Sequence, residues 1–424
     1  MIFRKSKFFV GRKSLRQGLS VLFDQGLTSL MNFFTGVMLA RSTTQEDFGY
    51  FVLGMSIIRL VVNLSNQTLL IPYTIERPGT PVQRQREFLG SLYIHGLVYC
   101  LVSSFIFMCG YAVSKMIRLD CFFSFIPILT TACLALLIKD FMRLTFLAEQ
   151  RYAMNLFFGS LTNIAVLLWF ILKFHYQSLD TRSAFFIFSV VLGPLTLLPL
   201  LARRGVRFTP KSWGTDFRKI WKTGKWLGAG CLTDYSAVAF WPVLITFFLG
   251  PKATAVYGIC FGLATILNPL LFASQDFMRT KVVVIVHESP QRIPFIFFST
   301  IIFLFLCYFP VVLFFAFFSR QVLAFVYGEM YSDNGVILVG CCVVFMLIAL
   351  SGQALLMINA LKLSKIAFWS RIIGASISLP LGIFLLPRIG LPGVVIALIG
   401  YFVINGGVWT TAVFQHLHYM RTTQ

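Results

Sequence analysis

Long apolar runs follow one another along the whole chain, separated by short polar connections. Most are about 20 residues or longer, the length that an α-helix needs to cross roughly 30 Å of hydrocarbon. They lack the alternation of apolar and polar residues that a membrane β-strand requires, so helices are the only reasonable spanning element. The pattern predicts twelve spans, centred near residues 29, 60, 100, 133, 164, 192, 236, 266, 306, 346, 377 and 404.

Two aspartates, Asp24 and Asp234, interrupt apolar runs at matching places about 210 residues apart. Each is followed, about 25 residues later, by a similar aromatic-glycine turn at Gly49 or Gly258. The repeat predicts an all-α membrane protein of two pseudo-symmetric six-helix bundles with a central cavity. Because six is even, both bundles have the same orientation and are related by an axis along the membrane normal.

The repeat also sets the expected domain boundaries. They are a basic N-terminal tail (1–17), a first six-helix bundle (18–202), a basic linker (203–222), a second bundle (223–415) and a C-terminal tail (416–424). Around the end of the linker, Phe217, Ile220 and Trp221 recur at helical spacing among lysines and arginines. This spacing suits a short helix on the membrane surface, and a solvated basic loop fits equally well.

The composition strengthens the membrane prediction and adds an orientation. The chain is 58% hydrophobic and 12% charged, with a mean hydropathy of +0.82. With the N-terminus inside, the inner connections hold about three times as many lysines and arginines as the outer ones, which predicts cytoplasmic termini. The few outer basic residues are Arg41, Lys115, Arg118, Lys173, Arg182, Lys252, Arg320 and Arg388.

The net charge of +21 belongs mainly to these inner connections. Basic loops at a cytoplasmic membrane surface attract anionic headgroups, so we expect anionic lipids and not nucleic acid as their partners. The expected location is a bacterial plasma (inner) membrane. No phosphate-binding glycine loop and no credible metal-ligand cluster occur, so we predict no cofactor and no enzyme activity.

Polar residues form a stripe along the second span. Arg59, Asn63, Asn66 and Gln67 occupy positions i, i+4, i+7 and i+8, which share one helix face. The corresponding positions of the second half include Asn268, Gln275 and Asp276. Because lipid would leave such groups unsatisfied, both stripes are expected to face a bundle interior or a water-filled cavity. Structural contacts between helices are the alternative role.

Lys139, Asp140 and Arg143 lie towards the inner end of the fourth span. Lys139 and Arg143 share a helix face, while Asp140 is spaced to pair with Arg143. The group suits a cationic entrance to a cavity. Snorkelling of the long side chains to the interface, with a local ion pair, explains it equally well.

Asp24 and Asp234 have two interpretations that the sequence leaves open. A carboxylate inside an apolar span costs on the order of 3 kcal/mol to insert, so an incidental one is rare. Either aspartate is a counter-ion to Arg59 or to another cation, or it binds the proton or sodium ion that drives transport.

The hairpin of the first two spans contains three distinctive segments: Asp24-Gln-Gly-Leu-x-Ser-x-x-Asn32-Phe, Leu39-Ala-Arg41 and Glu46-Asp-Phe-Gly49-Tyr. The turn between the seventh and eighth spans contains Leu249-Gly-Pro251 and Ala255-Val-Tyr-Gly258. The hairpin resembles that of Wzx-type polysaccharide flippases, members of the multidrug/oligosaccharidyl-lipid/polysaccharide (MOP) exporter superfamily, and the later turn is similar to the seventh-to-eighth helix turn of that family.

The resemblance implies a V-shaped pair of six-helix bundles that turns undecaprenyl-diphosphate-linked oligosaccharide from the inner to the outer leaflet. It implies a cationic cavity and coupling to an ion gradient, with H⁺ or Na⁺ as the ion. Asn32 and Arg41 are expected to shape the hairpin more than to contact substrate. The expected partners are therefore a lipid-linked oligosaccharide and, for assembly of O-antigen, capsule or exopolysaccharide, a polymerase or glycosyltransferases.

The candidate site residues fall into two groups. The substrate group is Arg59, Asn63, Asn66, Gln67, Lys139, Arg143, Asn268 and Gln275, and the group of counter-ions or coupling residues is Asp24, Asp140, Asp234 and Asp276.

Other functions compete with the flippase. A cation-coupled multidrug antiporter of the same superfamily should have a cavity dominated by carboxylates. A membrane glycosyltransferase or polymerase needs clustered acid, base and nucleophile, which the short outer loops do not offer. A non-transporting subunit of a polysaccharide synthase complex also fits the composition.

Overall fold

The computed structural model describes residues 12–77, 79–116, 125–177, 179–201, 206–268, 271, 293–361 and 363–422. Helices dominate these residues, and no strand occurs among them. All twelve predicted span centres fall on helical residues. The apolar pattern therefore located the helices correctly.

Eight helices of the described residues are long and apolar enough to cross a membrane, or nine if the bent pair Trp213–Ala239 and Trp241–Leu249 forms one span. Two further helices are long enough: α1 (Arg12–Ser42), whose polar side chains lower its hydropathy, and α6 (Ile126–Ala148), which is apolar but carries the three charged residues Lys139, Asp140 and Arg143. The chain is an all-helical, multi-pass membrane protein, as the sequence predicts.

By its internal contacts the chain divides into two units. Unit 1 comprises Met1–Thr35 and Val61–Lys225, and unit 2 comprises Gly36–Leu60 and Trp226–Gln424. The chain thus passes from one unit to the other inside three helices: α1, α2 (Gln45–Ser65) and α10 (Trp213–Asp234). The end of α1 and most of α2 belong to unit 2, although they come early in the sequence.

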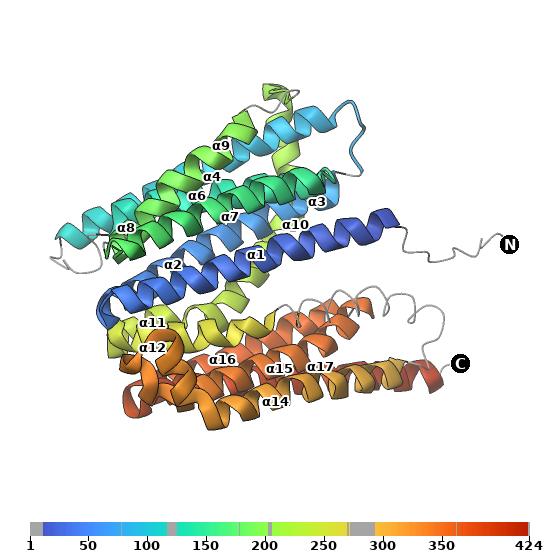
Figure 1. Ribbon diagram of the computed structural model, residues 1–424. Coiled ribbons are helices and arrows are strands. Elements are labelled where there is room, and N and C mark those ends of the chain that lie inside the picture. The colour runs from blue at the N-terminus through green and yellow to red at the C-terminus, as the bar shows by residue number, and fades with distance from the viewer. Residues whose placement is uncertain are drawn as a thin grey trace. The chain divides into compact units, whose positions relative to one another are not determined.

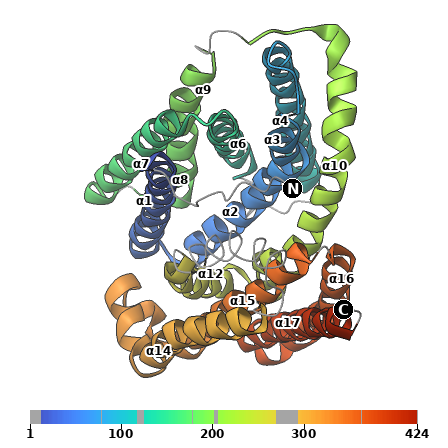
Figure 2. The ribbon, with the colours of Figure 1, turned by 90° about the vertical axis from the view of Figure 1, so that its right-hand side faces the viewer.

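In unit 1, α6 lies among the other helices. It contacts the helices of the third, fifth and sixth predicted spans. Figures 1 and 2 show this group of helices. The elements of this unit besides α1, α2, α6 and α10 are η1 (Asn66–Leu70), α3 (Ile71–Glu76), α4 (Gln85–Met116), α7 (Tyr152–His175), α8 (Thr181–Ile187), η2 (Phe188–Leu192), α9 (Gly193–Leu201) and η3 (Pro210–Ser212).

In unit 2, α17 (Leu391–Thr422) packs against α15 (Gly335–Ala360) and α16 (Ser364–Ile389), and α14 (Ile293–Tyr327) packs against α15. Figure 1 shows α14, α15 and α17 side by side. Phe297, Ile358 and Trp409 contribute to the buried core that joins these helices. The remaining elements are η4 (Tyr235–Ala239), α11 (Trp241–Leu249), α12 (Pro251–Ala264), η5 (Thr265–Leu267) and η7 (Glu329–Asn334).

Three spans contain a short π-helical segment, namely η1, η2 and η4. Such segments insert an extra residue into the helical turn and are frequent at functional sites. Two of them adjoin predicted polar positions, because η1 begins at Asn66 and η4 follows Asp234 directly. At η4 the helix also bends by 41° before α11.

Candidate functional site

The charged residues of α6 lie inside unit 1. Lys139 is only 8% exposed, and its amine donates a hydrogen bond of 2.6 Å to Asn163 Oδ1 on α7. The amide nitrogen of Asn163 donates in turn to Thr28 Oγ1 on α1, at 2.9 Å. The Lys139 amine is therefore part of a buried network and does not snorkel to the interface.

Asp24 is enclosed by the same three helices. The carboxylate residue is 2% exposed, with Arg143 Nε at 3.5 Å from Oδ2 and Asn155 Nδ2 donating to that oxygen at 3.2 Å. Gly159 on α7 leaves room for it, since a Cβ there would lie 2.1 Å from Asp24 Oδ1. Arg143 thus pairs with Asp24 and not with Asp140, because a buried carboxylate without a cation is costly.

Asp140 has a different partner on the second span. Asn66 Nδ2 donates to Asp140 Oδ2 at 2.8 Å, so η1 places one member of the predicted stripe against α6. Asn63 is exposed and Gln67 is partly buried, and neither forms a hydrogen bond to another described side chain. The residues of the predicted polar stripe on the second span therefore do not share one environment.

Arg59 lies on the part of α2 that belongs to unit 2, and its side chain is exposed. The nearby Tyr235 hydroxyl donates to the carbonyl of Ser56, one turn before Arg59. Among the described residues, no ion pair or side-chain hydrogen bond engages the Arg59 guanidinium. Asn268 is partly buried, close to the predicted centre of the eighth span, and Gln275 and Asp276 lie outside the described residues.

Asp234 has its own arginine. Arg371 Nη1 lies 3.2 Å from Asp234 Oδ2, and the two side chains are 25% and 47% exposed. Tyr401 also hydrogen-bonds to this carboxylate, and the Arg371 guanidinium lies 5.9 Å from the ring centroid of Trp409. Asp24 and Asp234 therefore each pair with an arginine of their own unit.

The sequence-based prediction missed Arg371 as a site residue. The charge count over the inner connections includes Arg371 in the connection before the eleventh span, whereas α16 begins at Ser364 and includes it. The signal in the sequence is its place about two helical turns inside that helix, since cations so placed are rare in apolar spans.

Comparison with known proteins establishes the fold. No protein-family model and no curated protein matches the sequence. Among solved structures, a multidrug-resistance MATE transporter of the MOP superfamily, in its inward-facing conformation, aligns with a TM-score of 0.70 at 14% identity, covering 94% of this chain and 96% of that chain. The lipid II flippase MurJ aligns with a TM-score of 0.69 at 13% identity, covering 94% and 87%.

The chain has the MOP-transporter fold. A third MOP transporter, from Pyrococcus furiosus, aligns with a TM-score of 0.54 at 12% identity and covers 96% of this chain and 95% of that one. The superfamily indicated by the hairpin residues is therefore also the one whose fold the structure has. Wzx-type specificity stays a prediction.

Within unit 2, the hairpin segments that contain Arg41 and Gly49 are held to later helices. Arg41 donates to the carbonyl of Val326 at 2.8 Å, at the end of α14, and Lys252 Nζ lies 3.2 Å from Glu46 Oε1. A Cβ on Gly49 would lie 1.9 Å from the Pro251 carbonyl oxygen, so glycine is required where α2 meets α12. These residues hold the hairpin of α1 and α2 to the later helices, as expected for residues that shape the hairpin.

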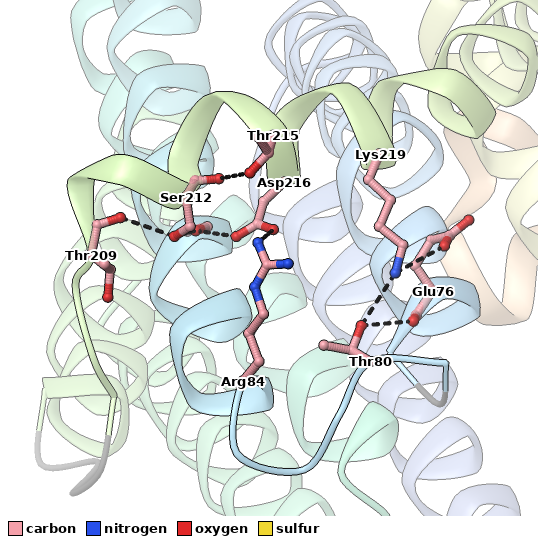
Figure 3. Close-up of polar contacts among 9 residues, drawn as sticks. Glu76, Thr80, Arg84, Thr209, Ser212, Thr215, Asp216 and Lys219 are labelled. Carbon is pink, nitrogen blue, oxygen red and sulfur yellow. Dashed lines mark hydrogen bonds and ion pairs between the residues drawn. The ribbon is translucent and has the colours of Figure 1, made fainter.

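Phe217, Ile220 and Trp221 lie in the helix α10, so the interpretation of this segment as a solvated loop is wrong. A place on the membrane surface stays a prediction. Figure 3 shows how the first turns of α10 are fixed to unit 1. Asp216 accepts hydrogen bonds from Arg84 at 2.9 Å and from Ser91 at 2.7 Å. One turn later, Lys219 Nζ lies 3.3 Å from Glu76 Oε2, while Ile220 is buried in the core of α3 and α4.

Proposed function

We propose that this protein moves an undecaprenyl-diphosphate-linked oligosaccharide from the inner to the outer leaflet of a bacterial plasma membrane. The observation that carries the proposal is Arg59, a cation in the middle of a predicted span with no counter-ion among the described residues. A cation so placed is costly unless it serves a ligand. A diphosphate supplies the oxyanions that a guanidinium binds most strongly.

The partners of the other intramembrane charges support an anionic substrate. Asp24 is paired with Arg143 and Asp140 with the amide of Asn66, so the two candidate carboxylates of unit 1 are already engaged. Among the MOP structures, the pocket of the Pyrococcus furiosus transporter is described as having reverse polarity, suggesting a different function. The same fold thus accommodates different pocket charges, and the charges of this chain favour an anion.

A multidrug antiporter is the second candidate. It is favoured by Asp234, whose side chain is 47% exposed and is available to attract a cationic drug. The solved multidrug transporters with the same fold keep this candidate open. Under this alternative, Asp234 is a substrate or coupling residue and Arg59 is dispensable.

Transport into proteoliposomes tests the two functions against each other. We expect a fluorescent undecaprenyl-diphosphate-linked oligosaccharide to be translocated, and Arg59→Gln to lower the initial rate at least about tenfold because a charge-assisted contact is lost. The matched control is Arg388→Gln near the end of α16, where the guanidinium stacks on Phe384; it should keep the parental rate. Uptake of a cationic dye that depends on Asp234 but not on Arg59 would support the antiporter.

A further inference from the structure

Asp24 and Asp234, which lie in the first span of each predicted half, have unequal surroundings. Asp24 is almost completely buried, and α6 and α7 hold it with a cation, an amide and the close approach of Gly159. Asp234 is half exposed, although it has an ion pair with Arg371 and a hydrogen bond with Tyr401. The two arginines are similarly exposed, with 29% of the Arg143 side chain and 25% of the Arg371 side chain accessible. The difference lies in the carboxylates, because that of Asp234 can move away from its arginine whereas that of Asp24 is enclosed by its neighbours.

Arg371 has unused hydrogen-bonding capacity. A guanidinium has five N–H donors in a planar fork, and the one ion-pair contact of Arg371 among the described residues is Nη1 with Asp234 Oδ2. The guanidinium carbon lies 5.9 Å from the centroid of the Trp409 ring, which is itself fixed by a hydrogen bond of 2.5 Å from Nε1 to Ser370 Oγ. A cation–π contact of this kind holds the guanidinium near the ring without using its N–H donors.

The present contact is also weaker than the one a phosphate would make. The Arg371–Asp234 pair is partly exposed, and water screens a partly exposed ion pair more than a fully buried one. A phosphate oxyanion presents several acceptors and binds arginine in bidentate geometry. Exchange of a single carboxylate contact for a bidentate phosphate contact is therefore favourable.

We propose that Arg371 is an oxyanion-binding position for a phosphate group of the substrate, and that Asp234 is an internal anion displaced from it on binding. The inference rests on the proposed function for the identity of the substrate, a lipid-linked diphosphate. It gives Asp234 the role of a competitor and not that of an ion-coupling site. It also leaves Asp24 as a structural counter-ion.

Binding of inorganic pyrophosphate to the purified full-length protein in detergent, followed by calorimetry, tests the exchange. We expect Arg371→Gln to weaken binding at least about tenfold and Arg371→Lys to weaken it less, because the charge remains and the fork is lost. Asp234→Asn should tighten binding several-fold, because the competing anion is removed. Arg388→Gln, on the same helix, should leave the affinity unchanged.

The sign of the Asp234→Asn effect is decisive. Weaker binding in this variant, or unchanged binding in Arg371→Gln, would overturn the proposal, provided that each variant keeps the parental melting temperature. If Asp234→Asn loses stability, Asp234→Ser and Asp234→Gln give the same test, since each also removes the charge.

The outcome is separable from that of the proposed function. Pyrophosphate binding with the expected pattern, but without translocation of the oligosaccharide, would retain the oxyanion site and reject the substrate. If Arg59→Gln abolishes translocation and Arg371→Gln leaves it intact, the flippase function is retained and the oxyanion site at Arg371 is rejected.

Discussion

At the scale of single residues, the protein uses different means to stabilise its intramembrane charges. Asp24 and Lys139 are buried and are satisfied by partners on neighbouring helices. Asp234 and Arg371 remain partly exposed, and Arg59 has no described counter-ion. Burial with full satisfaction indicates a structural role, whereas exposure inside a span indicates contact with a ligand or with water.

Gly159 is the residue on which the buried site depends most directly. We expect Gly159→Ala to destabilise the protein by about 1–3 kcal/mol, because overpacking forces the neighbouring atoms apart. The added methyl group would meet Asp24 Oδ1 and separate that carboxylate from Arg143. Thermal denaturation in detergent measures the effect.

Gly110→Ala is the control for this substitution. Gly110 lies in α4, and a Cβ there would meet nothing within 4 Å, so the variant should be as stable as the parent or slightly more stable. Equal melting temperatures for both variants would show that the space around Asp24 is not restricted.

At the scale of elements, α10 has the most distinctive role. It is a continuous helix whose first half belongs to unit 1 and whose second half belongs to unit 2. Its first turns are fixed by Asp216, Lys219 and Ile220, and Gly224 approaches η1, since a Cβ there would lie 2.2 Å from the Thr68 carbonyl oxygen. The basic linker is therefore an anchored structural element.

Removing the Asp216 carboxylate should loosen this anchor. Asp216→Ala leaves Arg84 and Ser91 without their acceptor, and we expect a local cost of about 1–3 kcal/mol. Amide hydrogen exchange of residues 213–225 should become faster, while exchange in α15 and α17 should stay the same. Thr215→Ala, at the exposed neighbouring position, is the control; equal exchange in both variants would show that Ile220 and the backbone contacts hold α10 without the carboxylate.

At the scale of the whole molecule, the chain has the MOP-transporter fold, and the basic residues give the expected orientation. The two ends of α14 illustrate the charge bias, because Lys281 and Arg292 precede this helix on the expected inner side and Arg320 lies near its outer end. Such a bias sets orientation during insertion, since cationic loops are retained in the cytoplasm.

Reporter fusions test the orientation. Green fluorescent protein fused after Gln424 should be fluorescent, because it folds in the cytoplasm, and alkaline phosphatase fused at the same place should be inactive. Phosphatase fused after Gly328, in the turn between α14 and η7, should be active. The reverse pattern would reject the cytoplasmic termini and, with them, the proposed direction of transport.

The sequence by itself determined the helical class, the positions of the spans and the pseudo-symmetric arrangement, and it singled out Asp24 and Asp234 as candidates. These features follow from local hydropathy and from the cost of polar groups in lipid, which act on each segment separately. Helical periodicity also placed Arg59 and Asn66 on one face. It did not give their surroundings, because sharing a face does not specify which helix lies opposite.

Only the tertiary structure decided the partners. Arg143 and Asn155 meet Asp24, and Arg371 meets Asp234, across helices far apart in the chain. The end of α1 and most of α2 belong to the unit of the later helices because Gly49 and Arg41 fit against α12 and α14. Such choices depend on which side chains fit together after the helices have assembled, so a buried counter-ion and an exchangeable one look alike in the sequence and differ in the folded protein.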